Sequence, residues 1–371
     1  MRILHLVDTC EHGEGRQQNW IVELCAKRGY ATTIVTSNCD TDNNPRGRDY
    51  FKEGDDSLKP VDIVRARGFK LKLPSLTTRS AYLPHPKLFG NYDLIHVYTV
   101  GSYSSFVGYF LKLVKPTKVV MRVELSTGLF LRLKGNPAFK WIVLKLINGA
   151  DALYSYTRRE VELLVELGVP EDKISIIPNG VDYAKFSKIR KTGGNITIGY
   201  LGRLLPFKGA HRLVQPLSKL MAECPDVRVI FAGSKTDTHY ADSIINAMSV
   251  NPNFSYLGYV PAMDFLKLCD IIIVPSLPDA FETGSIATLE AMAAGKAVIA
   301  SDATPMNEYL EHRFSGLLVE NDEQFYQYSK ELIEAPDLRA ELGRNARKRS
   351  LQYDWNVIFD KLEQIYKSLV S

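Results

Sequence analysis

Residues 275–302 read PSLPDAFETGSIATLEAMAAGKAVIASD and come directly after the apolar run Ile271–Val274. The run is short, uncharged and rich in β-branched residues, which predicts a fully buried strand. The quoted stretch then predicts a loop, a helix that begins near Ser285 and ends at Gly295, and a second buried strand at Ala297–Ala300. A strand, a helix and a strand in this order predict a parallel β-α-β unit.

The alternation of strand and helix patterns continues through the rest of the chain and restarts after a polar stretch that ends in Gly-Gly. We therefore predict a domain at 1–182, a linker at 183–195 and a second domain at 196–353. The fold class is α/β, with two Rossmann-like, doubly wound domains facing a central cleft. A ligand is expected at the carboxyl ends of the strands, in the crevice between the domains. Further strands are expected at Ile3–Val7, Ala31–Thr36, Asp62–Arg65, Leu94–Tyr98, Lys118–Val123, Asp151–Tyr154, Ile174–Ile177, Ile196–Tyr200, Val227–Ala232 and Phe254–Leu257.

The charge of the chain is distributed unevenly. Its net charge of +4 combines +8 over residues 1–190 with −4 over residues 191–371, and residues 57–150 contain 15 basic and only three acidic residues. A basic first half favours a negative partner, such as an anionic membrane, a phosphorylated lipid or nucleic acid. Nucleic acid is disfavoured because no recognisable binding motif accompanies the cations.

Other features of the composition exclude several classes of protein. The five cysteines are widely spaced and show no zinc pattern, which predicts free thiols in a reducing, cytoplasmic compartment. The N-terminal apolar run is too short for a signal peptide, and no uncharged apolar stretch is long enough to span a bilayer. A dinucleotide oxidoreductase is nearly excluded because no GxGxxG follows a strand.

Two glutamates mark the loop and the helix of the quoted stretch. Free N–H groups at the start of the helix favour a diphosphate there. Glu282, in the loop beside Gly284, is expected to reach a sugar next to that diphosphate, and Glu290, eight positions later, to accept hydrogen bonds from ribose hydroxyls. The alternative is that Glu282 is a solvated loop charge and Glu290 a charge on a helix face.

A second group of candidate residues lies at 199–209, GYLGRLLPFKG. A strand delivers Arg203 at its carboxyl end, and Lys208 follows five residues later. Gly202 has no side chain, so a ligand can approach the backbone closely. Two cations here would stabilise the charge that grows on a leaving diphosphate, without a metal. The alternative is a pair of surface cations unrelated to any ligand.

A set of motifs from both halves carries a resemblance to a known family. They are IPNGVD at 177–182, GRL at 202–204 with KG at 208–209, FAG at 231–233, GYV at 258–260, PS at 275–276 and EAMAAG at 290–295. This set resembles the retaining glycosyltransferases of family 4, which have the GT-B fold. The resemblance covers nearly the whole chain and is strongest over residues 174–302.

The resemblance implies an activity. It implies transfer of a hexosyl group from a UDP- or GDP-sugar to a carbohydrate or lipid-linked glycan, in the synthesis of a cell-surface polysaccharide or glycolipid, with neither metal nor cofactor. It also implies an acceptor site in the first domain, a donor site in the second, and a C-terminal helix at 354–371 that crosses back to the first domain. The reaction would retain the anomeric configuration, either with the leaving diphosphate taking the acceptor's proton or by double displacement, and both routes remain open.

The resemblance also assigns roles to residues. Arg203 and Lys208 would bind the donor diphosphate, Glu282 would face the transferred sugar, and these three are the candidate catalytic residues. Glu308 stands where the family often has a glutamate. The expected donor-binding residues are Gly202, Arg203, Lys208, Tyr259, Val260, Gly284, Ser285, Ile286 and Glu290.

The acceptor side is less well marked. Gly15, in a Gly-Glu-Gly turn, corresponds to the glycine-rich loop of the family, although a bare Gly-x-Gly is also a common structural turn. Glu124 departs from the family, which usually has a histidine at this position, and so indicates a different sugar or acceptor, or impaired catalysis. His96 is a third acceptor-side candidate, with a hydrogen-bonded histidine at the edge of the core as its alternative.

Residues 127–147, TGLFLRLKGNPAFKWIVLKLI, mix apolar and basic residues, a composition typical of an interfacial membrane helix. A peripheral membrane contact at the inner leaflet and a lipid-linked acceptor follow from this interpretation. The alternative, a helix that packs its apolar side on its own sheet, remains equally open. Asp40–Asp42 forms an Asp-x-Asp in a polar loop, where a solvated turn is favoured over a metal site.

A second class of function remains beside the transferase. A non-catalytic sugar-nucleotide-binding or scaffold protein of the same fold is supported by the departure at Glu124. The retained Arg203, Lys208, Glu282 and Glu290 argue against it.

Overall fold

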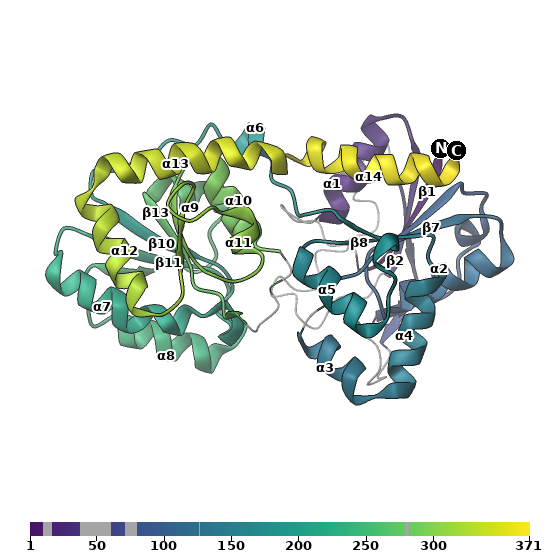
Figure 1. Cartoon of the computed structure of the whole chain (residues 1–371), viewed down its shortest axis with the longest axis horizontal. Helices are drawn as coiled ribbons and strands as arrows, with labels where there is room; N and C mark the ends of the chain where they lie inside the picture. The colour runs from purple at the N-terminus through teal and green to yellow at the C-terminus, as the bar shows by residue number, and fades with distance from the viewer. Residues whose placement is uncertain (10–16, 38–60, 71–79, 126, 279–281, 283) are drawn as a thin grey trace. The chain divides into compact units, whose positions relative to one another are not determined.

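The computed structural model describes residues 1–9, 17–37, 61–70, 80–125, 127–278, 282 and 284–371. The chain forms two compact units, and the first is discontinuous in sequence (Figure 1). It combines Met1–Pro178 with Asn356–Ser371, whereas the second is Asn179–Trp355. The stretch at 183–195 accordingly belongs to the second unit, and the C-terminal segment belongs to the first.

The first unit is built on a parallel sheet. Seven of the described strands pair in the order β3-β2-β1-β6-β7-β8-β9, and a separate antiparallel pair joins β4 to β5. The strands are β1 (Arg2–Thr9), β2 (Ala31–Ser37), β3 (Asp62–Ala66), β4 (Gly68–Lys70), β5 (Ser80–Tyr82), β6 (Leu94–Val97), β7 (Lys118–Arg122), β8 (Ala152–Ser155) and β9 (Ile174–Ile176). The helices are α1 (Gln17–Lys27), α2 (Tyr103–Val114), α3 (Thr127–Gly135), α4 (Pro137–Gly149) and α5 (Arg158–Leu167).

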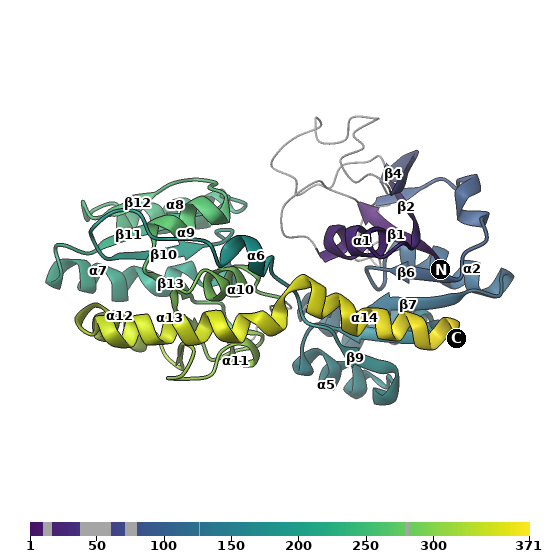
Figure 2. The ribbon, with the colours of Figure 1, turned by 90° about the horizontal axis from the view of Figure 1, so that it is seen from above.

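The last helix of the chain, α14 (Trp355–Val370), lies beside the other elements of the first unit (Figure 2), and polar contacts tie it to them. Arg28, just after α1, donates from Nη1 to Glu363 Oε2 at 2.9 Å. Deeper in the unit, the buried hydroxyl of Tyr366 lies 2.6 Å from His96 Nδ1 on β6. Because the second contact is fully buried, it orients the helix as well as attaching it.

The second unit is a second parallel, doubly wound sheet. Its described strands pair in the order β12-β11-β10-β13-β14-β15. They are β10 (Thr197–Leu201), β11 (Arg228–Ala232), β12 (Phe254–Tyr256), β13 (Ile271–Val274), β14 (Ala297–Ser301) and β15 (Leu317–Val319). The helices are α6 (Tyr183–Phe186), α7 (Val214–Glu223), α8 (Thr238–Met248), α9 (Ala262–Leu268), α10 (Ile286–Ala293), α11 (Met306–Tyr309), α12 (Glu323–Glu334) and α13 (Pro336–Ser350).

Strand β10 shows how alternate residues serve the two faces of this sheet. Ile198 and Tyr200 point into the core cluster that also contains side chains of α7, α8 and α12. Gly199 points to the opposite face, where α9 lies. A Cβ atom on Gly199 would stand 2.5 Å from Cys269 Sγ and 2.8 Å from the Phe265 ring. Glycine at this position therefore lets α9 pack directly on the strand.

The α/β class and the two Rossmann-like sheets are confirmed, and every strand expected from the sequence is present with shifts of one or two residues at its ends. Several elements were not predicted: α2, α8, the edge strand β15 and the β4–β5 pair. Cys25, Cys224 and Cys269 are free thiols. Cys10 and Cys39 lie outside the described residues.

Substituting Gly199→Ala should lower the free energy of unfolding by about 1–3 kcal/mol, because the added methyl group overpacks the contact with α9. Urea unfolding followed by circular dichroism measures the change. Gly194→Ala is the matched control, since a Cβ there meets no atom within 4 Å. Equal midpoints for the two variants would contradict this account of the α9 contact.

Candidate functional site

A pocket opens at the carboxyl ends of β10 and β13 in the second unit. Its volume is about 180 Å³. Six residues expected from the sequence to bind a donor line it: Gly202, Arg203, Lys208, Gly284, Ser285 and Ile286. The carboxyl edge of a parallel sheet is where such folds bind ligands, because the loops there diverge and helix N-termini face the opening.

At this edge of the sheet, the backbone segments that follow neighbouring strands approach each other unusually closely. A Cβ on Gly233, which has φ +148°, would lie 1.8 Å from Gly202 O. Gly233 N donates to Gly258 O at 2.8 Å. These contacts link the segments after β10, β11 and β12, so the glycines of the GRL, FAG and GYV motifs hold three adjacent loops together.

A buried carboxylate lies beside the pocket. Glu282 is 6% exposed, and its two oxygens accept from Lys208 Nζ and from Ser276 Oγ. A carboxylate this deeply buried requires such partners, since an unpaired one would be strongly disfavoured. The sequence-based alternative of a solvated loop charge therefore does not describe Glu282.

The two cations of the site differ in their surroundings. Lys208 is paired with Glu282. Arg203 follows β10, and its guanidinium carbon stands 5.9 Å from the centre of the Phe207 ring. Within the described part of the chain the Arg203 guanidinium forms no ion pair. Arg203 thus brings to the pocket a positive charge that no described carboxylate neutralises.

The start of α10 adds a second source of positive potential. Ser285 precedes the helix, as predicted, but its hydroxyl makes no capping bond to the helix backbone and instead accepts from Thr288 Oγ1 at 2.7 Å. The N–H groups of the first turn are consequently not capped by this side chain. Ser285 and Ile286 line the pocket, so the N-terminus of α10 lies at the pocket, and a helix N-terminus suits a negatively charged group.

Four other candidates stand outside the lining of this pocket. Tyr259 is 66% exposed, and Val260 beside it is half-buried. Glu290 is half-buried on α10, little more than one turn from its N-terminus. Glu308, in α11, accepts a hydrogen bond on its carbonyl oxygen from Tyr353 OH at 3.2 Å.

In the first unit, Glu124 lies just past the carboxyl end of β7. Arg122 Nη2 donates to its carboxylate at 3.0 Å, while Arg122 Nη1 donates to Tyr156 OH at 2.6 Å. Arg122 is buried and Glu124 is 40% exposed at its side chain, so a fixed guanidinium orients a carboxylate that remains open to solvent.

His96 has a different environment from the one expected of an acceptor contact. It is fully buried, with Nε2 2.9 Å from Tyr154 OH and Nδ1 bonded to Tyr366 OH. Burial lowers the pKa of His96 well below its usual value. These contacts favour the alternative of a satisfied core histidine. Gly15, the third acceptor-side candidate, lies outside the described residues.

Sequence reasoning missed two residues that position others. Ser276 was quoted within a motif without a role, and Arg122 lies two residues before Glu124 in the stretch MRVELSTG. The available signal was a polar residue at the end of a buried strand, where parallel-sheet proteins place functional side chains. The described residues hold no group of three or more His, Cys, Asp or Glu side chains that could bind a metal. Asp40–Asp42 lies outside them.

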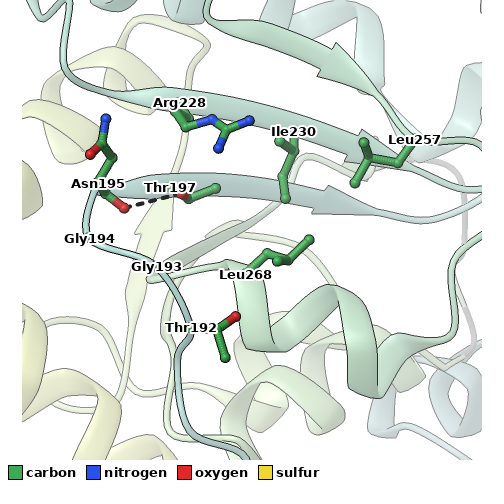
Figure 3. Close-up of a pocket in the computed structure, with 9 residues that line it drawn as sticks. All are labelled: Thr192, Gly193, Gly194, Asn195, Thr197, Arg228, Ile230, Leu257 and Leu268. Atoms are coloured by element: carbon green, nitrogen blue, oxygen red, sulfur yellow. Dashed lines mark hydrogen bonds between the residues drawn. The ribbon is translucent and has the colours of Figure 1, made fainter.

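A second pocket, of about 280 Å³, lies elsewhere in the second unit (Figure 3). Thr197 and Arg228, at the starts of β10 and β11, line it together with residues 192–195. It includes none of the candidate residues and is therefore not assigned to the same site.

Comparisons with known proteins agree with this arrangement. The model of the family "Glycosyl transferases group 1" matches residues 182–349, and that of "Glycosyltransferase Family 4" matches residues 21–185. A phosphatidyl-myo-inositol mannosyltransferase of Mycolicibacterium smegmatis is 30% identical over 203 residues, 52% of this chain and 51% of that protein. A capsular polysaccharide biosynthesis glycosyltransferase of Staphylococcus aureus is 25% identical over 67% of this chain and 71% of its own length.

The chain spans about half the length of two of the relatives it matches, 51% of the mannosyltransferase and 55% of an uncharacterized glycosyltransferase of Methanocaldococcus jannaschii. Among solved structures, a glycosyltransferase of Rickettsia africae aligns with a TM-score of 0.77 at 18% identity, covering 100% of this chain and 98% of that one. HepE of Anabaena, in complex with UDP-glucose, aligns at 0.74 and 18%, covering 99% and 100%. The chain belongs to the group 1, or family 4, glycosyltransferases and has their GT-B fold.

Proposed function

We propose that this protein transfers a hexosyl group from a UDP- or GDP-sugar to a carbohydrate or lipid-linked glycan acceptor, with retention at the anomeric carbon. One observation carries the proposal. The pocket at the carboxyl ends of β10 and β13 combines the Arg203 guanidinium, the Lys208 ammonium and the first turn of α10, which the Ser285 side chain does not cap. Positive groups converging on a small pocket suit a diphosphate.

The chemistry follows from where charge develops. As the bond between the sugar and the diphosphate breaks, negative charge grows on the leaving group, and fixed cations stabilise it without reorganisation. Arg203 is the cation available from the outset, whereas Lys208 shares its charge with Glu282. The cations take the place of a metal, so we propose that the reaction needs none. Glu282 and Glu290 are proposed to contact the transferred sugar and the ribose.

The acceptor side rests on the first unit. The exposed carboxylate of Glu124, held by Arg122, is proposed to accept a hydrogen bond from an acceptor hydroxyl. The described helices include none with the length and hydropathy that crossing a membrane requires. A cytoplasmic location, peripheral contact with the inner leaflet through residues 127–147, and a role in cell-surface polysaccharide or glycolipid synthesis are parts of the same proposal, and the names of the mannosyltransferase and capsular relatives support it.

The second candidate is a sugar-nucleotide-binding protein without catalysis. The departure at Glu124 from the histidine usual in the family favours it. The Lys208–Glu282 pair favours the transferase. Burying the Glu282 carboxylate costs desolvation free energy, and binding of a diphosphate alone does not require that carboxylate.

Arg203→Ala should abolish donor binding or lower donor turnover about 100- to 1,000-fold, because it removes from the pocket the cation that no described carboxylate pairs. The purified protein is incubated with a panel of UDP- and GDP-sugars, with and without EDTA. Release of the nucleoside diphosphate and the thermal shift caused by each donor are measured. Lys208→Ala and Glu290→Ala should weaken the same donor's effect, and EDTA should change neither readout.

Arg228→Ala is the matched control, since Arg228 is an exposed cation of the same sheet at its opposite edge. Donor stabilisation without nucleotide release, even with added glycan acceptors, would favour the non-catalytic binder. If no donor binds, or if Arg203→Ala and Arg228→Ala behave alike, the proposed site is wrong.

Ser276→Ala should lower the rate of nucleotide release about tenfold while preserving the thermal shift with the donor, because it removes one of the two partners that fix Glu282 but leaves both cations. Ser350→Ala, which truncates another buried serine of the second unit, is the control. Unchanged release in Ser276→Ala would mean that Lys208 alone positions the carboxylate.

A further inference from the structure

Helix α2 presents an apolar face that the first unit does not cover. The helix was not predicted from the sequence, and its inner side, with Ser104, Gly108 and Leu111, packs on the sheet. The outer side carries Phe106, Phe110, Leu113 and Val114, spaced so that they share one side of the helix. We call these four residues the α2 face. Phe110 is 52% exposed and Leu113 is 67% exposed.

The face continues beyond the helix. Lys115, the residue after α2, donates from Nζ to the backbone oxygens of Phe89 and Gly90, the latter at 2.8 Å. These bonds hold Phe89, which is 50% exposed, beside the end of the helix. Clustered exposed aromatic and aliphatic side chains mark an interaction surface, whereas a single one would need no explanation.

The charge around the α2 face selects the kind of partner. Residues 94–150 contain eight Lys and Arg and one acidic residue, Glu124. Lys112, Lys115 and Lys118 lie at the end of the face, and the acceptors of Lys115 are neutral carbonyls that leave its charge intact. Asp151 pairs with Lys112 at 2.7 Å, so the charge offered to a partner at this end of α2 comes from Lys115 and Lys118. An apolar face bordered by lysines is complementary to an anionic lipid surface.

A second copy of the chain fits this surface less well. A twofold interface would set each patch against itself and so bring two groups of lysines together. Anionic lipid headgroups attract each lysine instead, by about 1 kcal/mol per residue near the surface. At 12 residues the helix is too short to cross a bilayer, so it would lie along the headgroup region.

We propose that the α2 face, with Phe89 and the lysines at its end, docks the first unit on an anionic membrane. Residues 127–147 are a different segment. Much of their apolar surface is buried, including Phe130, Leu133 and Phe139, which leaves Leu131, Trp141 and Ile142 outside. Docking through α2 does not require the transferase reaction, so failure of the proposed activity leaves this inference standing.

The test is flotation of the full chain with vesicles of phosphatidylcholine alone and with about 30 mol% phosphatidylglycerol. The protein should float with the anionic vesicles only, and less as salt is added. The double variant Phe110→Ser/Leu113→Ser should reduce the bound fraction about tenfold or more, because it removes two exposed apolar side chains from the docking face. Lys118→Gln should weaken binding while leaving in place the α2 face and the Lys115 bonds that hold Phe89.

Val250→Ser is the control, since Val250 is 87% exposed in the second unit. Circular dichroism and light scattering are run on each variant. Failure of the unaltered protein to float, or floating of the Phe110→Ser/Leu113→Ser variant as well as the control, would overturn the proposal. So would loss of floating in Trp141→Ser without any loss in the α2 variant, or conversion of a dimer to a monomer by the α2 variant without a change in floating.

Discussion

The second unit is organised around the need to neutralise Glu282 inside the protein. A carboxylate that is 6% exposed must be paired, and its partners come from two different loops: Lys208 after β10 and Ser276 after β13. Those loops can meet only where backbone replaces side chains. A Cβ on Gly209, which has φ +71°, would lie 2.0 Å from Pro275 O, and Leu277 N donates to Phe207 O at 3.0 Å. The Lys208–Glu282 ion pair therefore requires glycine at position 209, where a side chain would keep the two loops apart.

The same arrangement gives Lys208 and Arg203 different roles. Lys208 is held in place by Glu282, which keeps its position but reduces the net field it exerts on the pocket. Arg203 has no such carboxylate among the described residues, and its planar, delocalised charge suits two phosphate oxygens at once. An anion entering the pocket would compete with Glu282 for Lys208, so ligand binding and the environment of the carboxylate are coupled.

The sequence predicted most of what local pattern determines. The buried strands, such as Ile271–Val274, are uniformly apolar, and a parallel sheet requires that pattern on both faces. Helix α2 does not follow the usual amphipathic pattern, because its more apolar side faces outward and its buried side carries Ser104, Ser105 and Gly108. Strand β15 was missed because three residues at a sheet edge carry too little signal.

The site was predictable to a similar extent. Glycines and charged residues in fixed order identified Gly202, Arg203, Lys208 and Ser285, which the structure brings to one pocket. Burial was not predictable, because it depends on residues distant in sequence. His96 is buried by Tyr154 and by Tyr366, which is 270 positions away.

The position of α2 relates the uneven charge of the chain to a particular exposed surface. Composition alone pointed to a mixed apolar and basic segment at 127–147, because side chains buried on folding cannot be distinguished there from side chains left outside. Folding buries Phe130, Leu133 and Phe139, and it exposes Phe110 and Leu113 on a helix that composition had not singled out. A membrane interacts only with what remains outside, so the location of a docking surface is a property of the fold, whereas the attraction to anionic lipid is already present in the sequence.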